Sequence, residues 1–148
     1  MNLFRIRPVF AILYLIVFAT WSCSTNPPEE QLQNIAGYWE IEKVELPDGQ
    51  VKEYTVNTTV DYIEVGQDST GFRKKLHPKP DGSFYASEDQ EDFKLSIQGK
   101  QLSLQYRTSL SEWEENVIKA TKDRLILRNT DNLKYFYKRF EPVDFGDR

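Results

Sequence analysis

Residues 35–44 have the sequence IAGYWEIEKV, in which a Gly-x-Trp begins an alternating run directly after a polar segment. Successive side chains of a β-strand point to opposite faces, so Trp39 and Ile41 share one face and Glu40 lies on the other. Gly37 lacks a Cβ at a point where neighbouring backbone must cover the large indole closely. This stretch is therefore predicted to be the first strand of a closed β-meander.

Length and charge limit the classes of protein to which the chain can belong. The sequence has 148 residues, of which 39% are hydrophobic and 14% aromatic, enough for one good hydrophobic core and hardly for two. The formal net charge is −4. Arg5 and Arg7 belong to the leader described next; without them, 17 basic and 23 acidic residues remain, and the net charge is −6. A single domain is expected, and no nucleic-acid partner, because that would need a clustered basic excess.

Residues 1–22 have the features of a targeting segment. Arg5 and Arg7 form a short basic start, and residues 9–19 are an almost unbroken apolar run that is short for a membrane span. The only cysteine of the chain, Cys23, follows a small residue at the end of this run. The arrangement resembles the lipobox of bacterial lipoproteins, in which the leader is cut before the cysteine and acyl chains attached to it hold the protein on a membrane. An ordinary secretory leader and an uncleaved anchor are the alternatives.

Residues 23–34 are predicted to be an acylated tether between the membrane and the folded domain. Pro27-Pro28 stiffens and extends it, and apolar residues return only at Leu32 and Ile35, so a single helical turn is expected at its end. The pair Glu29-Glu30 resembles the export signal of Bacteroidota lipoproteins. That resemblance implies a lipid-anchored protein of the cell envelope, at the outer membrane, on its periplasmic face or at the cell surface; a solvated linker is the alternative.

From Gly37 onward, short strand-like runs are separated by turn signals, and no stretch of ten or more residues has apolar residues at helical spacing. The chain is therefore predicted to be all-β, a single antiparallel meander of eight or nine strands. Closure into a barrel is the simplest way for such a meander to avoid exposed strand edges. The clearest alternation predicts a hairpin between residues 93–97 and 102–106. Polar loops are expected at residues 77–82 and 88–92.

Several short motifs, taken in order, resemble a bacterial lipocalin-like domain: Gly37-x-Trp39 on the first strand, Asp123-x-Leu125-x-Leu127 near the end, and Tyr135-Phe136-Tyr137-Lys138-Arg139 on the last strand. The resemblance covers residues 35–141 and leaves residues 142–148 as a C-terminal tail. It implies a lipocalin-like β-barrel in which a cation of the last strand packs over the first-strand Trp and closes the barrel base. Arg139 is the chosen cation and Lys138 the alternative.

Patterns typical of catalysis or metal binding are scarce. The chain has one histidine and one cysteine, and we find neither a nucleophile paired with a base nor a close set of metal ligands. No enzyme activity, metal or cofactor is therefore expected. His77 is predicted to lie in an exposed loop, and the carboxylates of Glu112, Glu114 and Glu115 on the outer face.

Two further polar motifs allow alternative interpretations. Arg73-Lys74-Lys75 is either a plain charged strand or a surface for an anionic ligand or for lipopolysaccharide. Asp68-Ser69-Thr70 resembles the O-glycosylation motif of the Bacteroidota, which would place a glycan on Ser69 in a turn.

The barrel interior decides between two functions, because an eight-stranded barrel is just wide enough to be filled by side chains or to hold one small ligand. The large residues predicted to point inward are aromatic: Trp39, Phe93, Tyr106, Trp113, Tyr135 and Tyr137. If the barrel binds a small apolar or amphipathic ligand, the expected contacts are Tyr106, Trp113, Tyr135 and Tyr137. If the interior is filled, the barrel is an accessory or interaction subunit of an envelope complex that uses an exposed face.

Overall fold

Antiparallel strands make up almost all of the fold in a computed structural model, which describes residues 25–141. The predicted targeting segment 1–22, Cys23 and the tail 142–148 lie outside the described residues. The elements are α2 (Pro28–Asn34), β1 (Gly37–Glu45), β2 (Val51–Glu53), β3 (Val60–Val65), β4 (Thr70–Pro78), β5 (Phe84–Gln98), β6 (Gln101–Arg107), β7 (Glu112–Ala120), β8 (Arg124–Asn129) and β9 (Lys134–Arg139). In the part of the chain that the structure describes, no helix is both long and apolar enough to cross a membrane.

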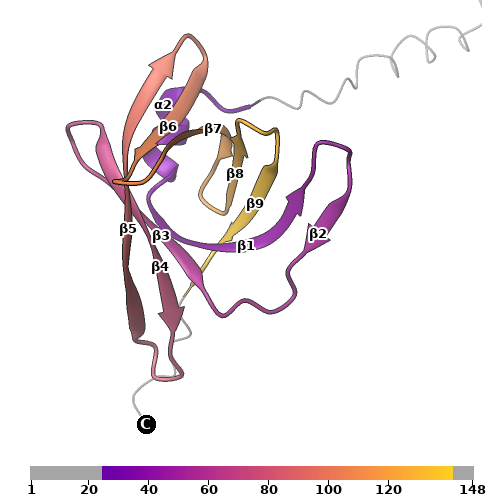
Figure 1. The fold of residues 1–148 in the computed structure, drawn as a ribbon, viewed down its shortest axis with the longest axis vertical. Coiled ribbons are helices and arrows are strands. Elements are labelled where there is room, and N and C mark those ends of the chain that lie inside the picture. The colour runs from indigo at the N-terminus through magenta and orange to yellow at the C-terminus, as the bar shows by residue number, and fades with distance from the viewer. Residues whose placement is uncertain (1–24, 142–148) are drawn as a thin grey trace, which may run out of the picture.

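The strands form a meander that closes on itself. Their order in the sheet is β2-β1-β3-β4-β5-β6-β7-β8-β9, and β9 pairs back with β1. Eight of these strands make a closed barrel, while β2 pairs only with the end of β1 and lies beside the barrel (Figure 1). The predicted all-β, lipocalin-like barrel of eight or nine strands is confirmed.

The predicted hairpin is also confirmed, since β5 and β6 pair with Phe93 opposite Tyr106 and Ile97 opposite Leu102. Because side chains alternate, this register puts one apolar face of the hairpin inside the barrel. Leu102 and Leu104 of this hairpin have no exposed surface, and neither has Leu125 of β8. These side chains belong to one buried apolar cluster inside the barrel.

Residues 28–34, part of the predicted tether, form the seven-residue helix α2 instead of a single turn. Proline is favoured in the first helical turn because it has no N–H to leave unpaired there, and Glu29 and Glu30 suit the positive end of the helix. Gln31 is 2% exposed and its Nε2 donates to the carbonyl of Ile118 at 3.5 Å. The helix therefore packs on one end of the barrel, next to β6 and β7 (Figure 1).

The loop predictions for residues 88–92 and for His77 are wrong, because both lie in strands. Residues 88–92 belong to the fifteen-residue strand β5, and His77 is a half-buried residue of β4 opposite Tyr85. Acidic runs usually indicate loops, but here β4 supplies basic neighbours across the ladder: Arg73 lies opposite Glu91. Opposite charges on paired strands stabilise each other, so this acidic run extends the strand.

Candidate functional site

A charged cluster lies inside the barrel, centred on Arg73 of β4. Its Nε donates to Glu91 Oε2 at 2.8 Å and its Nη1 to Glu115 Oε2 at 3.0 Å. The side chains of Arg73 and Glu115 are only 12% and 8% exposed, so this ion pair is almost removed from water. The guanidinium carbon also lies 4.7 Å from the centroid of the Tyr106 ring, a cation–π arrangement. The cluster therefore connects β4, β5, β6 and β7 through the barrel interior.

Strand alternation explains how these charges come to lie inside. Glu115 shares its face of β7 with the inward residues Trp113 and Val117, and Tyr106 of β6 lies opposite Trp113. The prediction that Glu115 is an outer-face charge is wrong, because its carboxylate is neutralised by an arginine 42 residues away in the sequence. In the Arg73-Lys74-Lys75 run, both Arg73 and Lys75 line the interior pocket described next, so the run is more than a plain charged strand.

A pocket of about 200 Å³ lies in the barrel beside this cluster. One part of its wall is apolar and aromatic, formed by Trp39, Ile41, Tyr135 and Tyr137; the other is charged, formed by Asp61, Arg73, Lys75 and Glu115. Lys75 Nζ contacts Asp61 Oδ1 at 3.0 Å, and the lysine side chain is 61% exposed, which places it at the solvent side of the pocket. The pocket thus offers an aromatic surface together with paired charges.

Burial sets the protonation of the groups around the pocket. It raises the pKa of the Glu115 carboxyl above its ordinary value, and the nearby Arg73 offsets this only in part. Burial also raises the pKa of the Tyr106 and Tyr137 phenols well above the usual range, so both keep their protons at neutral pH. Among residues 25–141, the buried Tyr106 hydroxyl has no hydrogen-bond partner of good geometry. The interior therefore contains neutral phenols beside charged groups.

We expect Glu115 to make the stability of the fold depend on pH. A carboxyl whose pKa is higher in the folded than in the unfolded state binds more protons when folded, so the free energy of unfolding falls as pH rises from about 4.5 through the raised pKa. Glu115→Gln removes this dependence of the unfolding free energy on pH. Across the interval between the unfolded and the folded pKa, the wild type loses about 1.4 kcal/mol of stability relative to the variant for each unit by which the two pKa values differ. Urea unfolding between pH 4 and 8 measures it. Glu114→Gln is the control, and parallel wild-type and Glu115→Gln profiles would contradict the expectation.

The four residues predicted to contact a ligand divide into two pairs. Tyr135 and Tyr137 of β9 line the pocket. Tyr106 lies under Arg73 and is 2% exposed, and Trp113 is half-buried and stacks on the Tyr106 ring at 4.8 Å with an interplanar angle of 7°. Neither lines this pocket.

Sequence reasoning missed the charged wall of the pocket. Two signals could have identified it. Asp61, a buried residue of β3, is a carboxylate in the middle of a β-branched and aromatic run, which is unusual in a strand. Glu115 is two residues from Trp113, so alternation puts both on the same inward face of β7.

Arg139 of the last strand packs over Trp39 of the first strand, which is the contact that the resemblance implied. The guanidinium carbon of Arg139 lies 3.7 Å from the centroid of the Trp39 ring. Its three nitrogens donate to backbone carbonyls before β1 and before β8, at 2.7 Å to Ala36, 2.9 Å to Asn34 and 2.8 Å to Lys122. Trp39 has no exposed surface. One arginine thus ties the segment after α2 to the first and last strands.

The structure also places Gly37, Lys138 and Ser69, which the sequence singled out. Gly37 has a φ of 120°, a backbone conformation that favours glycine, and a Cβ there would displace the Arg139 guanidinium. Lys138 points away from the Trp and contacts Glu40 Oε2 at 3.2 Å. Ser69 is exposed in the turn between β3 and β4 with a φ of 61°; its glycosylation stays a prediction.

Comparison with known proteins places the barrel in a family. No curated protein sequence matches the chain. The profile of the lipocalin-like domain matches residues 35–127, which is more than half of the chain and covers β1 to β7 and most of β8. The matched segment contains Trp39 and the Arg73 cluster, and its strands make up most of the antiparallel barrel, which β9 closes beyond the match. The chain therefore belongs to the lipocalin-like domain family.

Proposed function

We propose that this chain is a lipid-anchored protein of the cell envelope whose barrel binds one small amphipathic molecule in the interior pocket. The observation that supports binding is the pocket itself, about 200 Å³ of space between the aromatic and the charged walls. A barrel that served only as a packed scaffold would use its side chains to fill this space. In this proposal the barrel is a binding protein and has no catalytic role.

The two walls of the pocket limit the chemistry of the ligand. Tyr135 and Tyr137 offer ring surface and hydroxyls, while Arg73 and Lys75 are cations already paired with carboxylates. A wholly apolar molecule would remove water from these ion pairs without replacing its hydrogen bonds, which is costly. A ligand with a small apolar body and one polar group satisfies both walls. The volume is below the roughly 300–1,000 Å³ of sites for drug-sized ligands, so the ligand has few atoms.

Filling the pocket tests this function. Thr59, half-buried just before β3, lines the pocket, while its neighbour Thr58 is exposed. We expect native mass spectrometry of the full chain, incubated with a small-molecule extract of its own cells, to detect a bound compound with the wild type and with Thr58→Phe. Thr59→Phe should bind at least about tenfold less, since its ring occupies the space of the ligand.

Two results would contradict the binding function: the bare protein mass under every extract, or equal retention by Thr59→Phe and Thr58→Phe. The packed-barrel alternative, an accessory subunit of an envelope complex, would then be favoured. A comparison of thermal unfolding midpoints identifies a variant that loses binding only because it is unfolded.

The anchor part of the proposal rests on the leader, residues 1–22, followed at once by Cys23. We expect cells fed an alkyne-labelled fatty acid to incorporate the label into the wild type. Cys23→Ser should abolish incorporation and release the protein from the membrane fraction, because a serine accepts no thioether-linked lipid and the membrane affinity of acyl chains is lost with them. Ser22→Ala is the control. Equal labelling of Cys23→Ser would show that Cys23 is not the lipid attachment site.

A further inference from the structure

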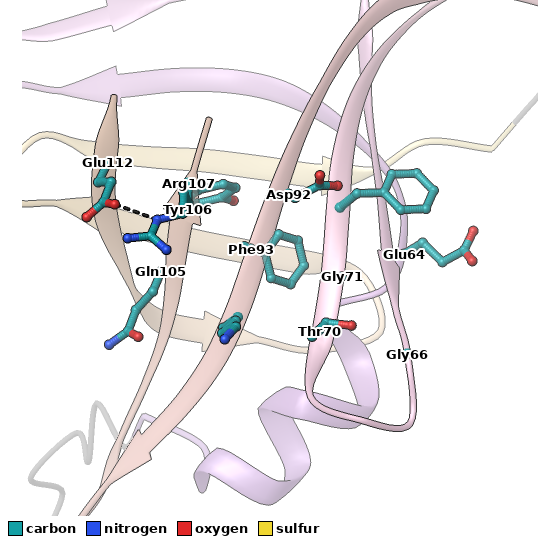
Figure 2. A pocket seen from close by; sticks show the side chains of 12 residues that line it. Glu64, Gly66, Thr70, Gly71, Asp92, Phe93, Gln105, Tyr106, Arg107 and Glu112 are labelled. Atoms are coloured by element: carbon teal, nitrogen blue, oxygen red, sulfur yellow. Dashed lines mark hydrogen bonds and ion pairs between the residues drawn. The ribbon is translucent and has the colours of Figure 1, made fainter. Parts of the chain in front are cut away.

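A second and larger hollow lies on the outside of the barrel, over β3 to β7 (Figure 2). Its volume is about 720 Å³. The side chains on its floor alternate with the core residues of the same strands: Phe72 is next to the inward Arg73, and Asp92 is next to the buried Phe93. The lining also includes Phe93 and Tyr106, whose side chains are buried in the barrel, but it shares no residue with the interior pocket.

The register of the sheet arranges the floor of the hollow in two rows. The first row crosses five strands through successive pairs: Glu64, Phe72, Asp92, Arg107 and Glu112. The second row lies two residues further along each strand, on the same face, and contains Thr70, Lys94 and Gln105. Adjacent strands are about 4.8 Å apart, so donors and acceptors recur at that spacing across the hollow. Figure 2 shows Gln105, Arg107 and Glu112 at one side and Glu64 at the other.

The charges of the hollow nearly cancel, and its carboxylates use only part of their capacity to accept hydrogen bonds. Three carboxylates, on Glu64, Asp92 and Glu112, face two cations, on Lys94 and Arg107. Among the described residues, each carboxylate has one side-chain donor: the Tyr62 hydroxyl to Glu64 at 2.9 Å, Gln90 to Asp92 at 2.6 Å, and Arg107 to Glu112 at 2.5 Å. A carboxylate accepts about four hydrogen bonds, so most of this capacity is free for hydroxyl donors of a ligand.

Aromatic rings extend from the hollow along the outer surface, and we name Phe72, Tyr62, Tyr38 and Phe84 the aromatic strip. Ring centroids are 6.0 Å apart between Phe72 and Tyr62, 4.8 Å between Tyr62 and Tyr38, and 5.3 Å between Tyr38 and Phe84. All four rings are partly exposed. An aromatic face carries partial negative charge and attracts the C–H hydrogens of a ligand. The strip continues the hollow over several ring widths.

We propose that this outer hollow, with the aromatic strip, is a second binding site and takes a neutral oligosaccharide. Sugars present C–H groups on the faces of their rings, which match the aromatic rings of the strip. Their edges carry hydroxyls, which match the remaining hydrogen-bonding capacity of the carboxylate, amide and guanidinium groups of the hollow. A polyanion would face three carboxylates against two cations, and an apolar ligand would leave those five charges desolvated. The length of the strip favours a chain of sugars over a single one.

The test is an NMR titration of the full chain in lauryldimethylamine oxide micelles, a detergent without a sugar head group. The probes are neutral oligosaccharides of glucose, galactose, mannose or N-acetylglucosamine, and one sulfated oligosaccharide. We expect saturable shifts of the backbone amides of Lys94, Gln105 and Arg107 with at least one neutral probe. Phe72→Leu should weaken this binding about tenfold, because it keeps the apolar bulk and removes the ring face. Tyr85→Leu, an exposed aromatic of β5 outside the hollow, should leave the affinity unchanged.

Three outcomes overturn the proposal: no shift in the hollow with any neutral probe, tighter binding of the sulfated probe, or equal affinity of Phe72→Leu and the wild type. Dispersed amide spectra of both variants show that they are folded. Thr59→Phe, which fills the interior pocket, should leave sugar binding intact, so failure of the interior ligand and failure of the outer site are distinguished.

Discussion

Arg73→Met is expected to destabilise the protein by about 3–5 kcal/mol, the usual cost of removing one partner from a buried ion pair. The methionine keeps most of the stem of the side chain, so the loss comes from the charge. Glu115, whose side chain is 8% exposed, would be left without its cation. Burial already raises the pKa of this carboxyl, and the loss of Arg73 raises it further. Urea unfolding at pH 7 measures the change in free energy.

Two companion variants show whether the ion pair is the cause. Lys74→Leu replaces the adjacent cation on the opposite face of β4 and should change stability by no more than about 0.5 kcal/mol. The double variant Arg73→Met/Glu115→Gln should recover part of the loss, because the amide carries no charge that needs a partner. If Arg73→Met costs no more than Lys74→Leu, the interior cluster does not stabilise the barrel.

Trp39→Ala is expected to cost about 3–5 kcal/mol, because it empties the largest fully buried site of the core. The indole contacts the Arg139 guanidinium at 3.7 Å, and its Nε1 donates to the carbonyl of Ile35 at 2.8 Å. Removing it therefore also loosens the segment between α2 and β1. Trp39→Phe keeps a ring under Arg139 and loses the hydrogen bond, for which about 1–2 kcal/mol is expected.

Thermal or urea unfolding of these variants gives the comparison, with Trp113→Ala as the matched control. Trp113 is half-buried and stacks on Tyr106 from one side, so its truncation should cost less than that of Trp39. A smaller loss for Trp39→Ala than for Trp113→Ala would mean that the Trp39–Arg139 contact does not close the barrel base. Should Trp39→Ala fail to fold, Trp39→Phe still provides the measurement.

The sequence predicted those parts of the fold whose signals are local. Alternation in residues 93–97 and 102–106 was sufficient for the β5–β6 hairpin, because each residue's face follows from its neighbours. The Trp39–Arg139 contact was accessible through family resemblance, which supplies a pairing of distant residues that no local pattern contains.

The interior cluster could not be predicted in the same way. Glu91 and Glu115 are each surrounded by other acidic residues, a composition that indicates a loop or an outer face. Their actual environment depends on Arg73, which is 18 and 42 residues away in the sequence. Once that partner is present, burial of the carboxylates is tolerated. Non-local charge pairing thus explains why acidic residues are tolerated on the inner face of β7 and within the long strand β5.

The pocket itself was equally inaccessible to the sequence. The list of inward aromatic residues is compatible with a filled barrel or an open one, and only the arrangement of Tyr135 and Tyr137 against Arg73 leaves the space of about 200 Å³. The outer hollow depends on register across five strands, which the sequence did not specify beyond the β5–β6 hairpin.

The central claim, a small ligand inside the barrel, is tested most directly by a crystal structure of the full chain purified from its own cells in a mild detergent. We predict electron density for one small molecule between Tyr137 and Arg73, with an apolar part on the aromatic wall and a polar group towards the charged wall. Density for ordered water alone, or side chains that close the space, would contradict the claim.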